Sequence, residues 1–266
     1  GVAYLIDHYS YVGVYWALCL FYWATLYIDY KIARLWLPKV SSLLASMAMG
    51  NRFDFDTYLS LHFFTSPDFN PAQLITHMFM HAGFTHFFFN MFALFMFGAS
   101  VERVLGAKKF LFYYISCGVG AALIQEAVYA IRYFNAIQHL STEDIAFITE
   151  NGRAVLDSMH NFADKYAAEL NIVTHTTMVG ASGAVYGILL AFGMLFPNMP
   201  IYIFFIPVPI KAKYVVAGYG IIEFLEGLST AADGIAHFAH LGGMLIGIIM
   251  ILYWKRKGNI YGNFNF

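Results

Sequence analysis

Two residues that could carry out hydrolysis lie in separate apolar segments of the chain. Ser182 lies in the run GASG at 180–183, and His240 lies in the run AHLGG at 239–243. A serine hydroxyl is a weak nucleophile at neutral pH and needs an adjacent base, commonly an imidazole. A serine and a histidine, each surrounded by small residues in a membrane-type segment, therefore suggest a nucleophile and its base acting inside a bilayer.

The composition indicates a membrane protein. The chain has 266 residues, of which 60% are hydrophobic and 12% are charged. A soluble domain of ordinary composition carries about 25% charged residues. The formal net charge is −1, so the charge balance offers no basis for binding nucleic acid. We expect the chain to be surrounded by membrane lipid. We expect it to have no nucleic-acid partner.

The apolar segments predict the topology, because about 20 apolar residues span the hydrocarbon core of a bilayer. They predict an all-α membrane protein, a six-helix bundle in a single domain over 1–266, with helices at 11–28, 85–101, 110–131, 178–196, 212–228 and 234–254. Two long connections follow the first and the third helix, at 29–77 and at 132–177. In the second connection, Ser141 with Asp144 three residues later is typical of a helix N-terminus. An amphipathic set of apolar residues follows, at Val155, Met159, Phe162, Tyr166 and Leu170. We expect this connection to form two short helices packed on the outer surface.

Basic residues in the short connections predict the orientation. With six helices, three clusters fall on one side, namely Arg103 with Lys108 and Lys109, Lys211 with Lys213, and Lys255 with Arg256 and Lys257. Lys and Arg mark the cytoplasmic side, so both termini are expected there and both long connections on the outer side. The expected location is a bacterial inner membrane.

Helices two, four and six then all enter the membrane from the outer side. Ser182 and His240 are expected roughly 10 Å below that surface, at 1.5 Å per residue. His86 and Asn90 reach a similar depth on helix two, and they share one face because they are four residues apart. Tyr186 shares a face with Ser182 for the same reason.

Glycines at helical spacing support this convergence. Gly183 and Gly187 form one Gly-x-x-x-Gly pair, and Gly243 and Gly247 form another. Such pairs allow helix backbones to approach closely in lipid. Taken alone, the pairs fit plain helix packing. Beside Ser182 and His240, they also fit a hydroxyl that must reach its imidazole.

The motifs together resemble the rhomboid intramembrane serine proteases. The run HAGFTHFFFN at 81–90 resembles their His…His-x-x-x-Asn motif, and GASG at 180–183 resembles their Gly-x-Ser-Gly motif, with Tyr186 in its usual place. The run at 239–243 resembles their final-helix motif. The resemblance extends over about 67–254. One departure is visible, because Ala72 stands where many members have Trp, and this concerns the anchoring of the outer loop.

The resemblance implies a role for each matching residue. Ser182 would be the nucleophile, and His240 the general base and then the general acid. His86 and Asn90 would donate to the oxyanion, together with a backbone N–H near Ser182. The supporting residues would be Tyr186 beside the ring of His240, Gly180, and His81, which would hold loop backbone in place.

The resemblance also implies a reaction. The family uses a Ser–His dyad with no carboxylate, no cofactor and no metal. The substrates would be single-pass transmembrane proteins, cut near the outer face of the membrane after a small residue. Of the other polar residues nearby, Glu223 and Glu226 are expected to face solvent at the outer end of helix five. His237 either forms a hydrogen bond near the site or packs as a plain side chain.

Two other functions are compatible with parts of the sequence. The spacings His77 to His81, His81 to His86 and His237 to His240 resemble the histidine boxes of metal-dependent membrane oxidoreductases, since imidazoles one turn apart can share a metal. Those boxes usually include adjacent His-His pairs, which this chain lacks. A catalytically inactive rhomboid-like protein that binds membrane proteins is the other alternative. Such proteins usually lack the serine or the histidine, so the presence of both favours activity.

Overall fold

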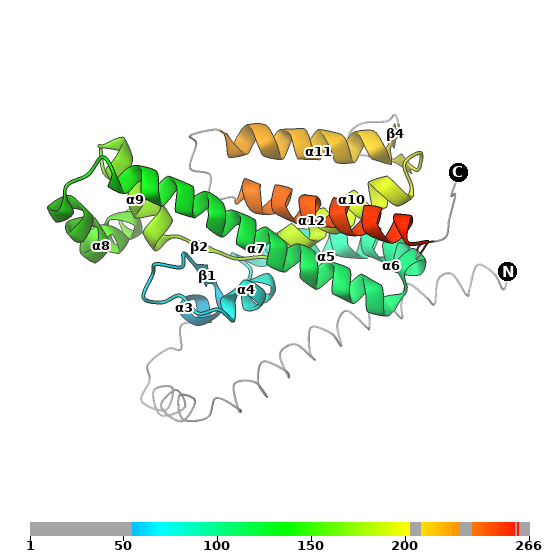
Figure 1. Cartoon of the computed structure of the whole chain (residues 1–266), viewed down its shortest axis with the longest axis horizontal. Coiled ribbons are helices and arrows are strands. Elements are labelled where there is room, and N and C mark those ends of the chain that lie inside the picture. The colour runs from blue at the N-terminus through cyan, green and yellow to red at the C-terminus, as the bar shows by residue number, and fades with distance from the viewer. Residues whose placement is uncertain (1–54, 203–208, 229–235, 259, 261–266) are drawn as a thin grey trace, which may run out of the picture. The chain divides into compact units, whose positions relative to one another are not determined.

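The structure, a computed structural model, describes the chain from residue 55 onward with short gaps, over 55–202, 209–228, 236–258 and 260 (Figure 1). Apart from Phe55, these residues belong to one unit, Asp56–Phe266. The helix predicted at 11–28 and the first part of the connection at 29–77 lie outside the described residues. The prediction of one domain over 1–266 therefore stays a prediction.

Long helices form the core of this unit. They are the continuous run α5 (Phe84–Ala93), η2 (Leu94–Gly98, a π-helical turn) and α6 (Ala99–Leu105), then α7 (Ala107–Ile137), α10 (Ser182–Leu195), α11 (Ala212–Gly227) and α12 (His237–Arg256). Helices satisfy their own backbone hydrogen bonds, which lipid cannot do for them. Among the residues that the structure describes, three runs are long and apolar enough to cross a membrane, namely Phe84–Leu105, α7 and α12. The chain is a predominantly helical membrane protein, and the total of six spanning helices stays a prediction.

Helix α10 lies at the centre of the bundle. It packs against α7, α11 and α12, and 11 of its 14 residues are buried. Helices α5, α10 and α12 run in one direction, and α7 and α11 run in the opposite direction (Figure 1). The N-terminal ends of three helices, and the C-terminal end of α11, are thus at the same end of the bundle.

Glycines bring the backbones of α10 and α12 into contact. A Cβ atom at Gly243 would overlap the backbone of Gly183. A Cβ at Gly187 would lie 2.6 Å from the Cys117 Sγ on α7 and 3.1 Å from the Gly243 carbonyl oxygen. The prediction that the glycine pairs allow close approach is confirmed.

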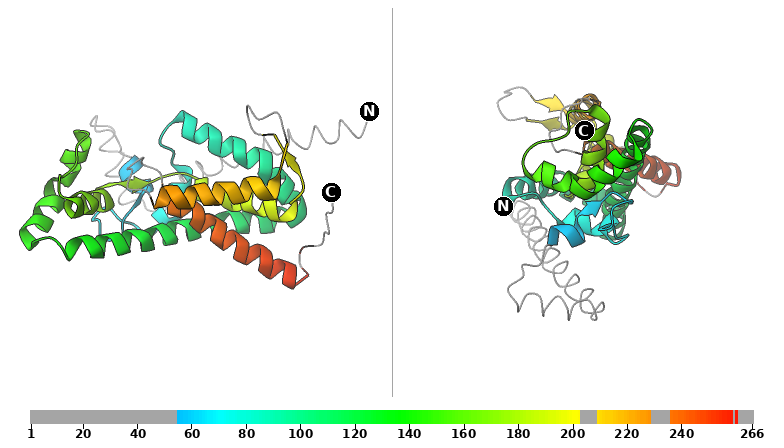
Figure 2. Two further views of the ribbon diagram at one scale, coloured as in Figure 1. Left: turned by 90° about the horizontal axis from the view of Figure 1, so that it is seen from above. Right: turned by 90° about the vertical axis from the view of Figure 1, so that its left-hand side faces the viewer.

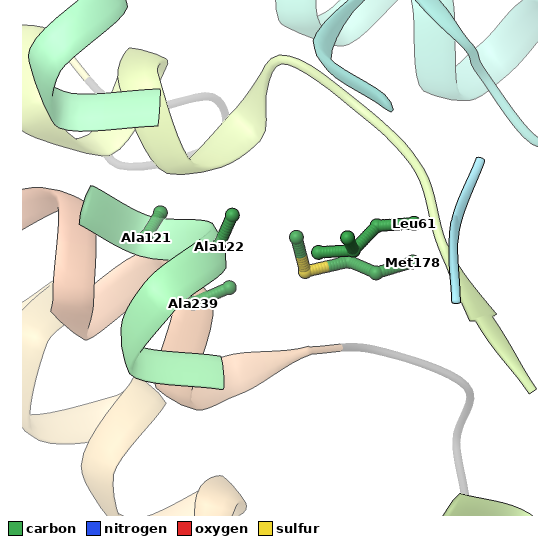
Figure 3. Close-up of a cluster of buried hydrophobic side chains, with 5 residues drawn as sticks. All are labelled: Leu61, Ala121, Ala122, Met178 and Ala239. Atoms are coloured by element: carbon green, nitrogen blue, oxygen red, sulfur yellow. The ribbon is translucent and has the colours of Figure 1, made fainter. Parts of the chain in front are cut away.

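A short strand pair fixes the chain just before α10. Strand β1 (Leu61–His62) pairs antiparallel with β2 (Thr177–Met178), with Leu61 opposite Met178. The side chains of Leu61 and Met178 point toward Ala121 and Ala122 of α7 and Ala239 of α12 (Figure 3). This apolar contact attaches β2 to the bundle four residues before Ser182.

The helix boundaries differ from the predicted ones where tertiary contacts decide them. The segment predicted to be helical from 178 is not helical before Ser182, because Gly180 adopts φ +118°, which is incompatible with a helix. Ser182 is therefore the first residue of α10. Helix α7 continues past the predicted end at 131, because Arg132 forms an ion pair with Glu169 of α9 (Lys165–His175). The insertion predicted at 132–177 thus begins only after Ile137.

The insertion itself folds as two helices, α8 (Thr142–Asp157) and α9, packed at one end of α7 (Figure 2). Ser141 caps α8, since its Oγ accepts a hydrogen bond from the Asp144 N–H at 3.1 Å, as the sequence predicts. The amphipathic set is not one helical face, however. Met159 lies between the two helices and is 94% exposed.

Short elements complete the unit. They are α3 (Phe55–Leu59), α4 (Gln73–Thr76), η1 (His77–Phe79) and the antiparallel pair of β3 (Pro200–Ile201) with β4 (Ile210–Lys211). Gln73, next to Ala72, anchors the loop before α5. Its side-chain oxygen accepts from the N–H groups of His62 and Asn70, each at 3.2 Å, and its Nε2 donates to the Asp68 carbonyl at 2.9 Å. A fully buried glutamine thus ties down the loop beside the position where Trp is missing.

We predict that Gly243→Ala destabilises the protein by about 1–3 kcal/mol, since the added methyl group must separate α10 from α12. Unfolding in detergent, by heat or by denaturant, measures this loss. The matched control is Gly218→Ala on α11, where a Cβ would have nothing within 4 Å. It should be neutral or stabilising by up to about 1 kcal/mol, because alanine favours helix. Equal destabilisation by both substitutions would contradict the close contact.

Candidate active site

Ser182 lies at the N-terminus of a buried helix. Its position at the start of α10 places it beside the N–H groups of the first turn, which have no intrahelical partner. The Gly180 N–H donates to the His77 carbonyl at 2.9 Å, so the segment before Ser182 is tied to η1. Burial lowers the pKa of His77 to about 4, and its ring is neutral at neutral pH. The serine hydroxyl is thus held at a fixed point among backbone donors.

His240 of α12 faces Ser182 directly. Its Nε2 lies 2.7 Å from the Ser182 Oγ, a hydrogen-bond distance, although the two residues are 58 positions apart. The ring of Tyr186, one turn after Ser182, stacks on the imidazole with centroids 4.3 Å apart and planes 6° apart. The three predicted residues on α10 and α12 are brought together. Ser182 and Tyr186 lie in the N-terminal part of α10, and His240 lies in the N-terminal part of α12.

Glu223 of α11 contacts the other side of this imidazole. Its Oε2 lies 2.9 Å from the His240 Nδ1 and 2.7 Å from the His237 Nδ1, and its Oε1 accepts from the Tyr186 hydroxyl. The residue is 5% exposed. The expectation that Glu223 faces solvent is wrong, because a carboxylate in an apolar helix is stable only where donors surround it. Glu226 is exposed as expected.

These contacts determine which nitrogen of His240 carries the proton. An ionised carboxylate only accepts hydrogen bonds, so both Nδ1 atoms that contact Glu223 must be donors. The neutral ring of His240 then presents a lone pair on Nε2 toward the Ser182 hydroxyl, which donates to it. Of the two interpretations of His237, the hydrogen bond near the site is the one that the structure shows.

His86, in the first turn of α5, lies against Gly180. Its Nδ1 accepts the Ala82 N–H at 3.3 Å, which leaves the proton on Nε2. A Cβ at Gly180 would lie 2.8 Å from that Nε2 and 3.7 Å from the Ser182 Oγ. The donor edge of His86 therefore faces the backbone that leads into Ser182. At this position the positive φ also requires glycine.

Asn90 and His81 lie next to His86. Asn90 is 6% exposed, its Nδ2 donates to the His86 carbonyl at 2.9 Å, and its Oδ1 has no hydrogen-bond partner among the described residues. The His81 ring contacts the rings of His86 and Phe87, with both centroid distances 5.3 Å. Burial, followed by the charge of His86, lowers the pKa of His81 to about 4 although it also hydrogen-bonds the Phe79 backbone. That His81 holds loop backbone in place stays a prediction.

One group of side chains has the composition of a metal site. Across 55–202, 209–228 and 236–258, the only trio with suitable ligand atoms within 4.8 Å of one another is Glu223, His237 and His240. A cation there would have to replace the protons on both Nδ1 atoms that now bond the carboxylate. His77 and His81 of the histidine-box hypothesis are not part of this group.

Comparison with known proteins identifies the family of the chain. A family model described as "Rhomboid domain" matches residues 69–257. The chain belongs to the rhomboid family. Relatives include Rhomboid protein 1, mitochondrial, of Saccharomyces cerevisiae, which is 28% identical over 184 residues, 66% of this chain and 40% of that protein. Rhomboid protease AarA of Providencia stuartii is 29% identical over 187 residues, 66% of this chain and 53% of that protein.

Another relative matches a shorter segment of the chain. Putative rhomboid protease YdcA of Bacillus subtilis is 45% identical over 47 residues, 18% of this chain and 24% of that protein. This chain thus spans about half or less of the length of the curated relatives it matches. Family membership and a named protease among the relatives support a rhomboid-protease-like function for this integral membrane protein.

We predict that Gly180→Ala lowers the rate at which a fluorophosphonate labels Ser182 by at least about tenfold, since a Cβ collides with His86 and the backbone must leave its positive φ. Labelling rates are measured by gel fluorescence in detergent. The control is Gly83→Ala, where a Cβ would meet nothing within 4 Å and the backbone is extended. An unchanged rate in Gly180→Ala would show that this backbone does not shape the site.

Proposed function

We propose that this rhomboid is an intramembrane serine endopeptidase in which Ser182 is the nucleophile and His240 is the general base. One observation carries the proposal, namely the 2.7 Å contact between the Ser182 Oγ and the His240 Nε2. The tautomer set by Glu223 supports it, because the lone pair on Nε2 is the one that a base requires.

The reaction proceeds through two acyl transfers. The Ser182 Oγ attacks the substrate carbonyl carbon while its proton moves to the His240 Nε2, and the carbonyl π electrons move to oxygen as an oxyanion. The C–N bond then breaks, and the amine leaves with the proton from Nε2. A water molecule, deprotonated by the same nitrogen, attacks the acyl-serine and releases the carboxylic acid and the free hydroxyl.

The oxyanion is stabilised by donors that are in place before the reaction. The candidates are the Nε2–H of His86, the side-chain amide of Asn90 and the first-turn N–H groups of α10. Fixed donors act strongly where water is excluded, because they do not need to reorganise. Tyr186 supports the imidazole by stacking, and His81 and Gly180 hold the surrounding backbone.

The substrates are single-pass transmembrane proteins that reach the site through lipid. An intact helix keeps its carbonyls in intrahelical hydrogen bonds, so residues that break a helix near the cut should favour cleavage. A small residue before the cut fits a site formed by closely packed helices. Cleavage takes place near the outer face of the membrane, on the side of the N-terminal ends of α5, α10 and α12.

The location follows from the positive charges. The end of α6, the start of α11 and the end of α12 lie at one end of the bundle (Figure 1), and each carries a basic cluster. Placing that end in the cytoplasm puts both termini there, in a bacterial inner membrane. The connection at 29–77 and the insertion at 132–177 then lie outside, and the chain forms one domain over 1–266.

Cleavage in liposomes tests the function directly. The purified protein is reconstituted with a fluorescent single-pass transmembrane substrate, and the products are separated by gel and mapped by mass. Wild type should cleave, and Ser182→Ala should not. Binding without cleavage by wild type would favour the inactive membrane-protein binder. Loss of activity to EDTA together with bound iron or zinc would favour a metal-dependent enzyme.

We predict that Asn90→Ala and His86→Ala each lower kcat by about 10²–10³, as expected for the loss of an oxyanion donor. The reduction should appear in kcat rather than in KM, because the oxyanion is absent from the bound substrate and forms only during the reaction. Steady-state kinetics in liposomes measure both constants. Phe88→Ala is the matched control on the exposed face of α5 and should stay within about twofold of wild type.

A further inference from the structure

A buried carboxylate lies where an isolated acid would be unstable. Glu223 is 5% exposed within α11, surrounded by the apolar bundle. Burying an uncompensated charge is strongly unfavourable, and ionisable side chains inside a membrane bundle mark functional sites by default. A position near the end of α11 does not by itself explain why this carboxylate is buried.

The carboxylate is compensated by three donors from two neighbouring helices. Tyr186 of α10 donates to Oε1, and His237 and His240 of α12 donate to Oε2. Glu226, one turn further along the same helix, is exposed and lies 3.5 Å from the His237 Nδ1. The position of the Glu223 carboxylate is thus fixed from both of its oxygens.

The chain of contacts is linear from acid to nucleophile. Glu223 Oε2 lies 2.9 Å from the His240 Nδ1, and the His240 Nε2 lies 2.7 Å from the Ser182 Oγ. Acid, base and nucleophile come from α11, α12 and α10. The order of contacts is that of the serine-protease triads, in which a carboxylate orients the base and stabilises the imidazolium that forms.

We propose that Glu223 is the positioning residue of a Ser182–His240–Glu223 triad. This departs from the Ser–His dyad that the family resemblance implies, and it rests on the protease function proposed above. The carboxylate keeps the proton of neutral His240 on Nδ1 and the lone pair on Nε2. When Nε2 takes the Ser182 proton, the negative charge of Glu223 balances the imidazolium, and Glu223 itself stays ionised throughout.

His237 and Tyr186 are the supports of the acid. Tyr186 donates to Oε1, and His237 donates to a lone pair of Oε2 other than the one that accepts from His240. They therefore restrict Glu223 to the rotamer in which Oε2 meets the His240 Nδ1. His237 thus acts on the base through Glu223, whose Oε2 lies 2.7 Å from the His237 Nδ1.

Kinetics of two Glu223 variants test the positioning role. Glu223→Gln should lower kcat by at least about 100-fold, since an amide in place of a triad carboxylate can hold the imidazole in the wrong tautomer. KM should change less than about threefold, because the carboxylate does not contact substrate. Glu223→Asp keeps the charge and should recover part of the lost kcat. Wild-type kcat in Glu223→Gln would overturn the proposal.

The matched control is Glu226→Gln. It removes the same charge from the same helix but not from His240, and kcat should stay within about twofold of wild type. Melting temperatures in detergent show whether each variant is folded. An equal kcat loss in Glu226→Gln and Glu223→Gln would mean that general charge on α11 matters and would overturn the specific role.

Nitrogen NMR of the histidine rings tests the tautomer without any turnover. In the wild-type protein with ¹⁵N-labelled histidine, the His240 signals are identified from their loss in His240→Gln. We expect a protonated Nδ1 with a strongly downfield proton and a bare Nε2. A proton on Nε2 in wild type would overturn the proposal even if Glu223→Gln does not fold. Because this measurement needs no substrate, it separates failure of the triad from failure of the protease function, which the liposome assay detects.

Discussion

The contact between the backbones of α10 and α12 is the constraint on which the site depends. The Gly183 and Gly243 backbones lie so close that not even one methyl group fits between them. Only at this separation can the hydroxyl of Ser182, on a short side chain, reach the Nε2 of His240 at 2.7 Å. In lipid, such an approach is driven by packing rather than by the hydrophobic effect, so small residues are the means to achieve it.

The same close packing makes the electrostatics of the site demanding. The imidazole of His240 is buried, so each polar group around it needs a defined partner. Glu223 takes three donors, His240 uses both ring nitrogens, and His86 uses Nδ1 for the Ala82 N–H. The positions of the acid, the base and the candidate oxyanion donor are therefore linked, since each hydrogen bond restricts the next group along the chain.

Much of the fold and part of the candidate site could be predicted from the sequence. The helices at 85–101, 212–228 and 234–254 were predicted to within about four residues at each end, because their apolar runs are long, whereas the helix predicted at 110–131 continues to Ile137. Ser182 and His240 could be paired because both lie in small-residue motifs on helices that start from the same side. Gly180 could not be assigned its positive φ, since only the approach of His86 and the tie to His77 reveal why the helix begins late.

Glu223 shows the limit of the sequence most clearly. An acid near the end of an apolar helix is compatible with solvent or with the bundle interior, and the choice depends on which face of α11 meets α12. The one usable signal was the presence of His237 and His240 as possible donors. Arg132 is a similar case. Its charge predicts the end of a membrane span, but Arg132 lies within the longer α7 and forms an ion pair with Glu169 of α9.

The central claim is that the Ser182 hydroxyl is activated by His240. Peptide mapping by mass spectrometry, after the folded protein has reacted with a fluorophosphonate, tests it most directly. The account predicts one adduct for each chain, on Ser182, and none in His240→Gln under the same conditions. An adduct on another residue, or equal labelling of Ser182 when His240 is replaced, would contradict it.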